Sequence, residues 1–480
     1  MTEVIVVGSG PAGMMLAGEL ALAGVDVRLL ERRESAQLVG SRAGGFHART
    51  LEILDQRGIG DRFVAAGQPA QTARFGSTTL DIGALPTPRP YGLALWQDRI
   101  EPLLAAWIAE LGVRVERGAE VVGLAQDATG VDLRLADGRA ARAAWVVGAD
   151  GGRSTIRRSA GIDFPGWDAT GSTLIGEVEV AEEPPSGVHQ DTAGVHGLHP
   201  LGAGRYRVVT AERVLAHGEA TLDDLRASLR AALGSDFGVH APVWLSRFTD
   251  ATRQAAEYRR GRVLLVGDAA HIHYPAGGQG IGLGIQDAVN LGFKLARVAR
   301  GVAPATLLDT YHSERHPADA RALQLSMAGT ALQRRDPRVE ALATVVDDLL
   351  GTAQGSELLA ARIHGLDVDY APEAWHPLVG RRVPDVEVVT DGGPVRAFAL
   401  LHEARGVLID LIPGRAWDDA RVPVVRGRVD EPWVLPVMGE VEAPTAVLVR
   451  PDGHVAWVEN AAPEPVDDAI ERWFGVSAIR

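Results

Sequence analysis

Hydrophobic and polar residues change their pattern several times along the chain, and each change predicts a different kind of structure. The first segment is "EVIVVGSGPAGMMLAGELALAGVDVRLLERR". It has an apolar run at residues 4–7, a helix-length apolar stretch after the glycines, and a second apolar run that ends at Glu31. Short apolar runs separated by a helical stretch are typical of a strand–helix–strand unit with buried parallel strands. The chain is therefore expected to begin with an α/β domain.

The pattern becomes alternating between residues 172 and 258, where "GRYRVVT" and "PVWLSRFTDATRQ" surround one helical stretch, "TLDDLRASLRAAL". Alternation predicts strands with one buried face, so a sheet-based domain is expected here. The run "GRVLLVG" at residues 261–267 returns to the α/β pattern. Helical periodicity then continues to about residue 365, and alternation returns after residue 375.

These changes predict an α/β protein of three domains, which fits a length of 480 residues. A discontinuous Rossmann-like domain is expected at residues 1–171 and 259–375. A middle sheet domain for the substrate is expected at residues 172–258, and a third domain at residues 376–480. Residues of about 70–95 carry Pro, Gly and short alternating runs, and they belong to either the first or the middle domain.

Composition and charge exclude several classes of function. The chain is 46% hydrophobic and 23% charged, as in soluble globular proteins, and its net charge of −14 argues against nucleic acid or an anionic membrane as the main partner. It has no cysteine, which excludes disulfides, thiolate zinc sites and cysteine nucleophiles. No stretch has the length of a transmembrane helix, and the first residues enter a strand without a targeting signal. We expect a cytoplasmic protein.

The glycine-rich loop after the first strand predicts a dinucleotide site. Gly8, Gly10 and Gly13 follow the G-x-G-x-x-G pattern, which allows a tight turn and lets backbone N–H groups approach a pyrophosphate. Glu31 lies eighteen residues after Gly13, at the end of the second strand, where a carboxylate can bind ribose hydroxyls. This motif alone does not separate NAD from FAD. The alternative is an ordinary turn with a solvated Glu31.

A second glycine-rich loop follows the strand at residues 261–267. Asp268 lies at the carboxyl end of that strand, where open α/β sheets bind ligands, and a carboxylate suits a polyol hydroxyl. The loop from Pro275 to Gly284 enters a long helix, whose N-terminal N–H groups and dipole favour negative charge. If the ligand is a flavin, this charge is the one that gathers at N1 and the C2 carbonyl upon reduction. The two loops would then hold two ends of one cofactor. The alternative is that Asp268 only caps a turn.

Two histidine pairs raise the question of a metal. His271 and His273 form an H-x-H pair, and His312 and His316 are spaced by one helical turn. A metal site needs a third ligand, which the sequence does not place, so we expect no metal and assign these histidines to hydrogen bonding near the first domain.

The motifs together resemble those of the class A FAD-dependent aromatic hydroxylases of bacterial polyketide tailoring, of the angucycline and anthracycline type. The resemblance is carried by the first glycine loop, the turn at Asp150 and Gly151, and Gly267 with Asp268. It continues in "SRAGGFHARTLEILDQRGI", "HIHYPAGGQG", "YHSERHP" and "RPDGHVAW", and so covers nearly the whole chain. It implies the para-hydroxybenzoate hydroxylase fold with a thioredoxin-like C-terminal domain. Without cysteine, that domain would serve packing or assembly.

The resemblance also implies roles for single residues. The ADP half of FAD would lie on Gly8, Gly10, Pro11, Ala12, Gly13, Glu31 and Arg32. The pyrophosphate, ribityl chain and mobile flavin would lie near Arg42, Gln97 and Asp268, and Asp150 would serve both FAD and NAD(P)H. The isoalloxazine ring would face Pro275, Gly278, Gln279, Gly280, Ile281 and Gly282. Many relatives have Asn in place of Gly282 and Trp in place of Phe293, so flavin mobility or substrate fit can differ here.

The implied reaction is hydroxylation of a polycyclic aromatic polyketide. Only one complete dinucleotide fingerprint is present, which fits bound FAD and an NADPH or NADH that docks transiently. Dioxygen would form a hydroperoxide at flavin C4a, and the substrate would lie between the FAD domain and the middle sheet. No catalytic acid or base is assigned, because the cofactor carries the chemistry. The chain is expected to be a monomer or homodimer.

Other functions remain open from the sequence. The same fold supports Baeyer–Villiger insertion and oxidative inactivation of an antibiotic such as a rifamycin. A flavin-free NAD-dependent dehydrogenase would be colourless, and a non-catalytic protein that keeps FAD as a structural element would not consume NAD(P)H.

Overall fold

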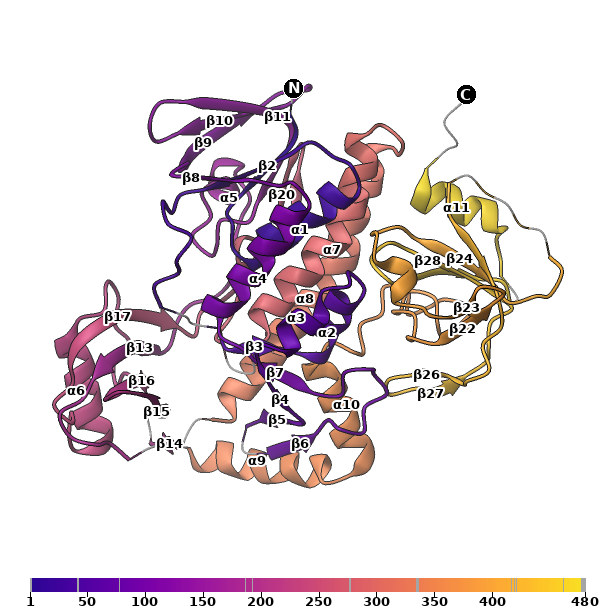
Figure 1. The fold of residues 1–480 in the computed structure, drawn as a ribbon. Coiled ribbons are helices and arrows are strands. Elements are labelled where there is room, and N and C mark those ends of the chain that lie inside the picture. The colour runs from indigo at the N-terminus through magenta and orange to yellow at the C-terminus, as the bar shows by residue number, and fades with distance from the viewer. Residues whose placement is uncertain are drawn as a thin grey trace.

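The chain is arranged as three regions placed side by side (Figure 1). A central body holds α1, α4, α7 and α8, a lobe on one side holds α6 with β13–β17, and the C-terminal region lies on the other side. The computed structural model describes residues 2–475, except residues 41–42, 77, 186, 192, 276–277, 334–335, 416, 418, 420 and 461.

A mostly parallel sheet forms the core of the central body, and we call it the main sheet. Its strands lie in the order β19-β20-β11-β1-β2-β8, in which β20, β11, β1, β2 and β8 are parallel. Parallel strands are usually covered on both faces, and the apolar residues 4–6 of β1 are indeed fully buried. The strands are β1 (Thr2–Val7), β2 (Val27–Glu31), β8 (Val115–Arg117), β9 (Val121–Gln126), β10 (Val131–Leu135), β11 (Ala140–Gly148), β19 (Arg259–Arg260) and β20 (Val263–Leu265).

Helix α1 packs between α4 and α7 in the central body. It begins at Pro11, before the last glycine of the loop rather than after it, because Gly10 is the N-cap and Pro11 occupies the first turn. Helix α7 begins earlier than expected, at Gly280, so the last five residues assigned to the loop, 280–284, belong to the helix. The helices of this body are α1 (Pro11–Leu22), α2 (Ala48–Asp55), α3 (Gly60–Val64), α4 (Gln97–Glu110), α5 (Thr155–Ser159), η1 (Gly267–Ala269), α7 (Gly280–Ala299), η2 (Ala305–Leu308), α8 (Asp309–Ala331), α9 (Pro337–Leu350) and α10 (Ala353–Ile363).

The middle lobe is a five-stranded antiparallel sheet, which we call the middle sheet. Its order is β14-β15-β16-β13-β17, and Leu174 and Val178 of β13 pack against α6 on one face. The opposite face therefore remains available to the central body. Its elements are β13 (Ser172–Glu179), β14 (Gly187–Gln190), β15 (Val195–Gly202), β16 (Arg205–Ala211), α6 (Leu222–Leu233) and β17 (His240–Thr249).

Small sheets connect the lobes. Strands within residues 70–95 pair with each other and with β3 rather than with the middle sheet. They pack toward α10, where Leu80, Ile82 and Ala360 share a cluster. These strands are β3 (Gly45–Phe46), β4 (Gln68–Ala70), β5 (Thr72–Phe75), β6 (Thr78–Asp81) and β7 (Gly92–Ala94), and a separate sheet joins β12 (Gly166–Trp167), β18 (Thr252–Gln254) and β21 (His271–Ile272).

The C-terminal region has its own core around the mixed sheet β25-β24-β28-β29 and the buried Trp433. Helix α11 covers this sheet, and two hairpins flank it. The elements are β22 (Glu387–Thr390), β23 (Gly393–Arg396), η3 (Ala399–Leu401), β24 (Val407–Asp410), β25 (Val424–Arg426), β26 (Trp433–Leu435), β27 (Gly439–Val441), β28 (Ala446–Val449), β29 (Val455–Val458) and α11 (Val466–Phe474). Among the described helices, none is long and apolar enough to span a membrane.

Candidate active site

Three turns meet at the carboxyl edge of the main sheet. Gly8 follows β1, Asp150 follows β11 and Gly267 follows β20, and these strands are neighbours. Gly8 has a φ of +106°, and a Cβ there would lie 2.3 Å from the carbonyl oxygen of Ala149. A Cβ on Gly267 would lie 3.1 Å from the Cβ of Ala12. The two glycine-rich loops thus touch each other, as a single long cofactor requires.

The first glycine loop leaves backbone room for a phosphate. A Cβ on Gly13 would lie 2.0 Å from the carbonyl oxygen of Gly8, so this glycine of α1 lets the helix pack closely against the loop. A Cβ on Gly10 would meet no described atom within 4 Å, so the backbone there is open. The first intrahelical bond runs from Met14 N–H to Gly10, 2.9 Å, so the N–H groups of Ala12 and Gly13 precede it. This geometry fits a pyrophosphate.

Glu31 organises the first loop from the end of β2. The Ser9 N–H and Oγ donate to Glu31 Oε2 at 2.8 and 2.9 Å, and the Arg33 N–H donates to Oε1 at 2.9 Å. Burial alone would raise the pKa of Glu31, but these donors outweigh it and hold the pKa below its ordinary value. The carboxylate therefore stays ionised, and it retains acceptor capacity for a ribose hydroxyl.

A series of side-chain hydrogen bonds links Glu31 to Gln97. Arg33 donates to Glu31 at 3.3 Å and to Glu101 at 2.9 Å, and Gln97 Nε2 donates to Glu101 at 2.9 Å. The predicted Arg32 is exposed instead. Sequence reasoning missed Ser9, Arg33 and Glu101. The signal for Arg33 was strand parity, because residues two apart in an extended chain share a side.

The second loop presents a free carboxylate beside a helix N-terminus. Asp268 is exposed, and no described residue donates a hydrogen bond to it. The first bond of α7 runs from Leu283 N–H to Gln279, 3.0 Å, so the N–H groups of Gly280, Ile281 and Gly282 precede it. Gly278 is exposed with a φ of +70°. These donors and the helix dipole fit a ligand that gains negative charge.

Gly282 stands where many relatives have Asn, and the packing around it requires a residue without a side chain. A Cβ at this position would lie 2.7 Å from Thr50 Oγ1, so α7 approaches α2 more closely than a side chain allows. Gln279 supports the same corner, because it is buried and its Nε2 donates to the Ile363 carbonyl at 3.3 Å. An Asn at residue 282 would need Thr50 to move.

Asp150 has a structural task in the third turn. Its carboxylate accepts hydrogen bonds from Ser154 Oγ at 2.5 Å, Thr155 N–H at 2.7 Å and Ile156 N–H at 3.1 Å. These bonds cap the short α5 and hold the turn beside Gly8. Of the other predicted residues, Pro275 is exposed at the second loop, and Arg42 lies outside the described residues.

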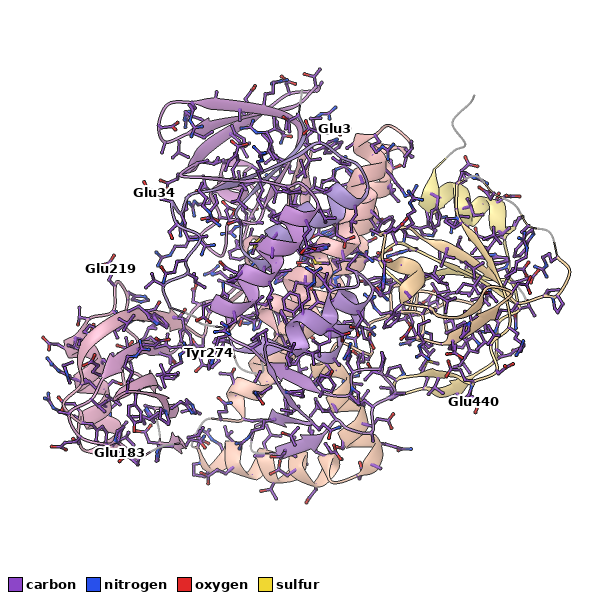
Figure 2. All side chains as sticks on the ribbon, viewed as in Figure 1. Glu3, Glu34, Glu183, Glu219, Tyr274 and Glu440 are labelled. Atoms are coloured by element: carbon purple, nitrogen blue, oxygen red, sulfur yellow. The ribbon has the colours of Figure 1, made fainter. Side chains whose placement is uncertain are left out.

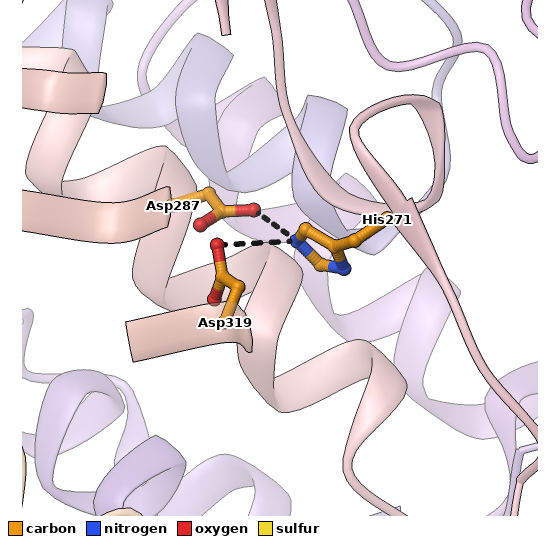
Figure 3. Close-up of side chains that lie close together, drawn as sticks. All are labelled: His271, Asp287 and Asp319. Atoms are coloured by element: carbon orange, nitrogen blue, oxygen red, sulfur yellow. Dashed lines mark hydrogen bonds and ion pairs between the residues drawn. The ribbon is translucent and has the colours of Figure 1, made fainter. Parts of the chain in front are cut away.

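The histidine pairs do not converge on one point. His273 Nδ1 contacts the Tyr274 carbonyl at 2.7 Å, whereas His271 lies with Asp287 and Asp319, whose ligand atoms are within 4.8 Å of one another (Figure 3). All four carboxylate oxygens of that trio accept hydrogen bonds, and the Arg315 guanidinium pairs with both acids. A cation there would have to displace Arg315, so the trio is an ion-pair network.

Tyr274 connects the second loop to the middle sheet. It lies at the junction of the central body and the middle lobe (Figure 2). Its hydroxyl is 3.3 Å from Thr173 Oγ1, and its ring centroid is 5.6 Å from that of Phe248. Burial raises the pKa of this phenol, which therefore stays neutral. The free face of the middle sheet is thus turned toward the second loop.

Two cavities lie away from the glycine-rich loops. One of about 340 Å³ lies between the central body and the C-terminal region and is lined by five prolines and by arginines such as Arg382. Another of about 340 Å³ lies beside Arg153 and Arg247 and is mostly polar. Neither is lined by the glycine-rich loops, so we place no substrate in them.

Comparisons with known proteins agree with this geometry. The FAD-binding domain family matches residues 1–326, and the C-terminal domain of aromatic-ring hydroxylases matches residues 376–477. A rifampicin monooxygenase of Streptomyces venezuelae is 43% identical, with 99% of each chain covered. The structure of an anhydrotetracycline hydroxylase of Streptomyces rimosus is 41% identical over 99% of each chain, with a TM-score of 0.92. That of an aromatic hydroxylase from angucycline biosynthesis is 39% identical over 99% of this chain and 100% of its own, with a TM-score of 0.90.

These matches confirm the fold expected from the sequence and identify the cofactor as FAD, with NAD(P)H as the usual reductant of the class. The chain belongs to the FAD-dependent aromatic-ring hydroxylases, a family of flavoprotein monooxygenases.

Proposed function

We propose that the protein hydroxylates an angucyclinone-like aromatic polyketide with NAD(P)H and dioxygen. The names of two relatives support this substrate class, namely the hydroxylases of anhydrotetracycline and of angucycline biosynthesis. The observation that carries the proposal is the contact of Tyr274 with Thr173 and Phe248, which joins the second glycine loop to the free face of the middle sheet. A substrate on that face would lie next to the redox end of the cofactor.

The proposed cofactor site follows the three turns. The open backbone at Gly10 and the N–H groups of Ala12 and Gly13 would bind the pyrophosphate, with Gly8 and Pro11 shaping the loop. Glu31 would accept ribose hydroxyl groups, with Arg32 at the edge of this site and Gln97 held nearby through Glu101. Asp268 would accept a hydroxyl of the ribityl chain. Asp150 would act indirectly, by fixing the turn beside Gly8.

The start of α7 would face the flavin ring. The N–H groups of Gly280, Ile281 and Gly282 and the positive end of the helix dipole stabilise negative charge, which a reduced flavin carries. Pro275, Gly278 and Gln279 would border the ring from the loop. FAD supplies hydride acceptance from NADPH or NADH and activation of dioxygen, so no side chain is assigned as acid or base.

The substrate would lie on the free face of the middle sheet. Strand alternation places Thr173, Ile175 and Glu177 on this face, opposite Phe248, Ser246 and Trp244 of β17. Thr173 and Ile175 are buried and the other four are half-buried. Ile175, Phe248 and Trp244 give this face the apolar and aromatic surface that suits a polycyclic ring system. Arg207 pairs with Glu177 at one end of this face. The Arg207 guanidinium carbon lies 3.7 Å from the centroid of the Trp96 ring.

The proposal keeps the domain boundaries expected above: residues 1–171 with 259–375, residues 172–258, and residues 376–480. Dependence on intracellular NAD(P)H supports a cytoplasmic location. The proposed assembly is a monomer or homodimer, which light scattering of the purified protein would decide.

A second outcome of the same chemistry is oxidative inactivation of an antibiotic or Baeyer–Villiger insertion. The similarity to a rifampicin monooxygenase favours this alternative, since that relative is 43% identical over the whole chain. The two proposals share the cofactor site and differ in the substrate that the middle sheet accepts and in the place where the oxygen atom enters it.

The test is a visible spectrum of the purified protein followed by NADPH oxidation in the same cuvette. The protein is mixed in turn with buffer, an angucyclinone and rifampicin. Flavin bands and oxidation stimulated by the angucyclinone, with a product 16 mass units heavier that carries a new hydroxyl on an aromatic carbon, would support the first proposal. The same gain in mass with the oxygen inserted into a ring C–C bond would support Baeyer–Villiger insertion. Stimulation by rifampicin alone would support the second. A protein that stays colourless after addition of FAD would contradict both.

A further inference from the structure

A buried polar cluster lies directly behind the turn at Gly267 and Asp268. It consists of His271 from β21, Asp287 from α7, Arg315 and Asp319 from α8, and Tyr258, all at most 1% exposed. Figure 3 shows His271 with the two aspartates. Two carboxylates face two basic side chains, so their charges compensate one another. Burying such a cluster costs desolvation free energy, which its own ion pairs and hydrogen bonds must offset.

The cluster holds the turn through one carboxylate. Asp287 Oδ2 accepts the Gly267 N–H at 3.0 Å and His271 Nε2 at 2.8 Å. The end of β20, just before this turn, is fixed by α8, because the Tyr311 hydroxyl donates to the Leu265 carbonyl at 2.7 Å. Residues on both sides of Asp268 are therefore tied to α7 and α8, while Asp268 itself points to solvent.

Asp287 is in turn oriented by Arg315. The Arg315 Nε donates to Asp287 Oδ1 at 2.8 Å, and the same guanidinium pairs with Asp319. Asp319 also accepts the Tyr258 hydroxyl at 3.0 Å. Rotation of Asp287 would break several charged hydrogen bonds at once, so the position of the Gly267 N–H is strongly determined.

Tyr370, which lies just before the C-terminal region, and a turn within that region brace this cluster. Arg315 Nη1 donates to the Tyr370 hydroxyl at 3.2 Å, and the Tyr370 ring lies 4.3 Å from that of His454. His454 belongs to the turn of residues 450–454, whose Arg450 binds Glu314 at 2.6 Å. Asn290, one helical turn after Asp287, donates to Asp452 at 3.2 Å. One turn of the C-terminal region thus contacts both helices that carry the cluster.

We propose that Asp287 and Arg315 are positioning residues that hold the Gly267 and Asp268 turn in the geometry that binds FAD, and that Tyr370 and the turn of residues 450–454 brace them. This inference rests on the proposed contact of Asp268 with FAD. It gives the cysteine-free C-terminal region a role in cofactor binding at a distance. The motifs "HIHYP", "YHSERHP" and "RPDGHVAW" then serve one purpose.

The test is a fluorescence titration of the FAD-free protein with FAD, made on D287N, D268N and a control. Asp410 is a buried aspartate of β24 in the C-terminal region, so D410N makes the same chemical change away from the turn. D287N should raise the dissociation constant of FAD about tenfold, because a buried charged network loses one partner. D410N should change it by less than about twofold. The visible spectrum of bound flavin should shift in D287N and not in D410N.

The outcomes separate this inference from the proposed site. If D268N weakens FAD binding and D287N behaves like D410N, the positioning role is wrong while the site stands. If D268N has no effect, the proposed contact of Asp268 fails, and the inference fails with it. Y370F removes only a hydroxyl and should raise the dissociation constant about threefold. If D287N does not fold, the titration of Y370F with FAD tests the positioning role in its place. An unchanged dissociation constant of FAD in Y370F would then overturn the inference.

Discussion

At the scale of single residues, Glu31 has a structural role in addition to its proposed binding of a ribose. Its carboxylate accepts hydrogen bonds from Ser9 and Arg33, and these bonds fix the backbone next to Gly10. The acid that recognises the ligand therefore also orders the loop that binds the phosphates. Loss of its charge should affect both tasks.

Glu31→Gln tests this double role. We expect the dissociation constant of FAD to rise about tenfold, because hydrogen bonds to a charged acceptor are worth more than those to an amide. Titration of the FAD-free variant with FAD measures the effect. Glu34→Gln is the matched control, since Glu34 is exposed. Equal affinities of the two variants would refute the role of Glu31.

His271 predicts how stability depends on pH. Burial alone would lower the pKa of His271, but Asp319 and Asp287 raise it to about 9. A raised pKa stabilises the fold below the ordinary value of 6.5, and this contribution is lost as the pH rises through 9. Between pH 7 and 9 the free energy of unfolding should fall by about 2 kcal/mol.

Urea unfolding at pH 7 and pH 9 measures this loss. His271→Gln cannot be protonated, so its free energy of unfolding should change much less over the same interval. Parallel pH profiles of the variant and the wild type would show that another group titrates.

The individual residues were only partly predictable. Gly8, Gly10, Gly13, Glu31 and Asp268 stand at strand ends, which the sequence pattern locates, and the structure brings them to one edge. Arg33 and Glu101 were missed because they are 68 residues apart and meet only in the folded chain. The contacts of all these residues with FAD stay predictions.

At the scale of elements, the position of α7 decides the shape of the site. It crosses α1 so closely that a Cβ on Gly292 would lie 2.5 Å from the Cβ of Glu19. Its first turn contains glycines that weaken a helix, which is why the sequence predicted a loop there. Packing against α1 and α2 overrides this preference.

Gly292→Ala should therefore destabilise the protein despite the better helix propensity of alanine. Overpacking costs about 1–3 kcal/mol, which exceeds the gain in propensity. Gly329→Ala in α8 is the matched control, because its Cβ would have an ordinary contact of 3.4 Å with Phe75. Thermal unfolding should show a lower midpoint for the first variant and an equal or higher one for the second. The reverse order would contradict the close crossing.

At the scale of the whole molecule, charged residues join the C-terminal region to the central body. Arg450 is 3% exposed and binds both Glu314 and Asp452, and Arg57 binds Glu19 and the Pro451 carbonyl. The segment "RPDGH" joins two apolar runs and is rich in turn-forming residues, and such turns usually lie at the surface. It is buried here because its partners come from helices far away in the chain.

Arg450→Ala should cost about 3–5 kcal/mol, since it removes the guanidinium that pairs with the buried Asp452 and leaves Lys294 as the cation beside Glu314. Arg428→Ala removes an exposed arginine of the same region, 67% exposed, and should change little. Thermal unfolding and limited proteolysis compare them, and we expect the C-terminal region of the Arg450 variant to be released sooner. Equal behaviour would show that this turn does not hold the regions together.

The central claim is that the three turns and the middle sheet together form a monooxygenase site for a polycyclic aromatic substrate. Turnover of an angucyclinone under ¹⁸O₂ with NADPH tests it most directly. The account predicts a product that carries one ¹⁸O atom on an aromatic carbon. NADPH oxidation that returns the angucyclinone without ¹⁸O would contradict it.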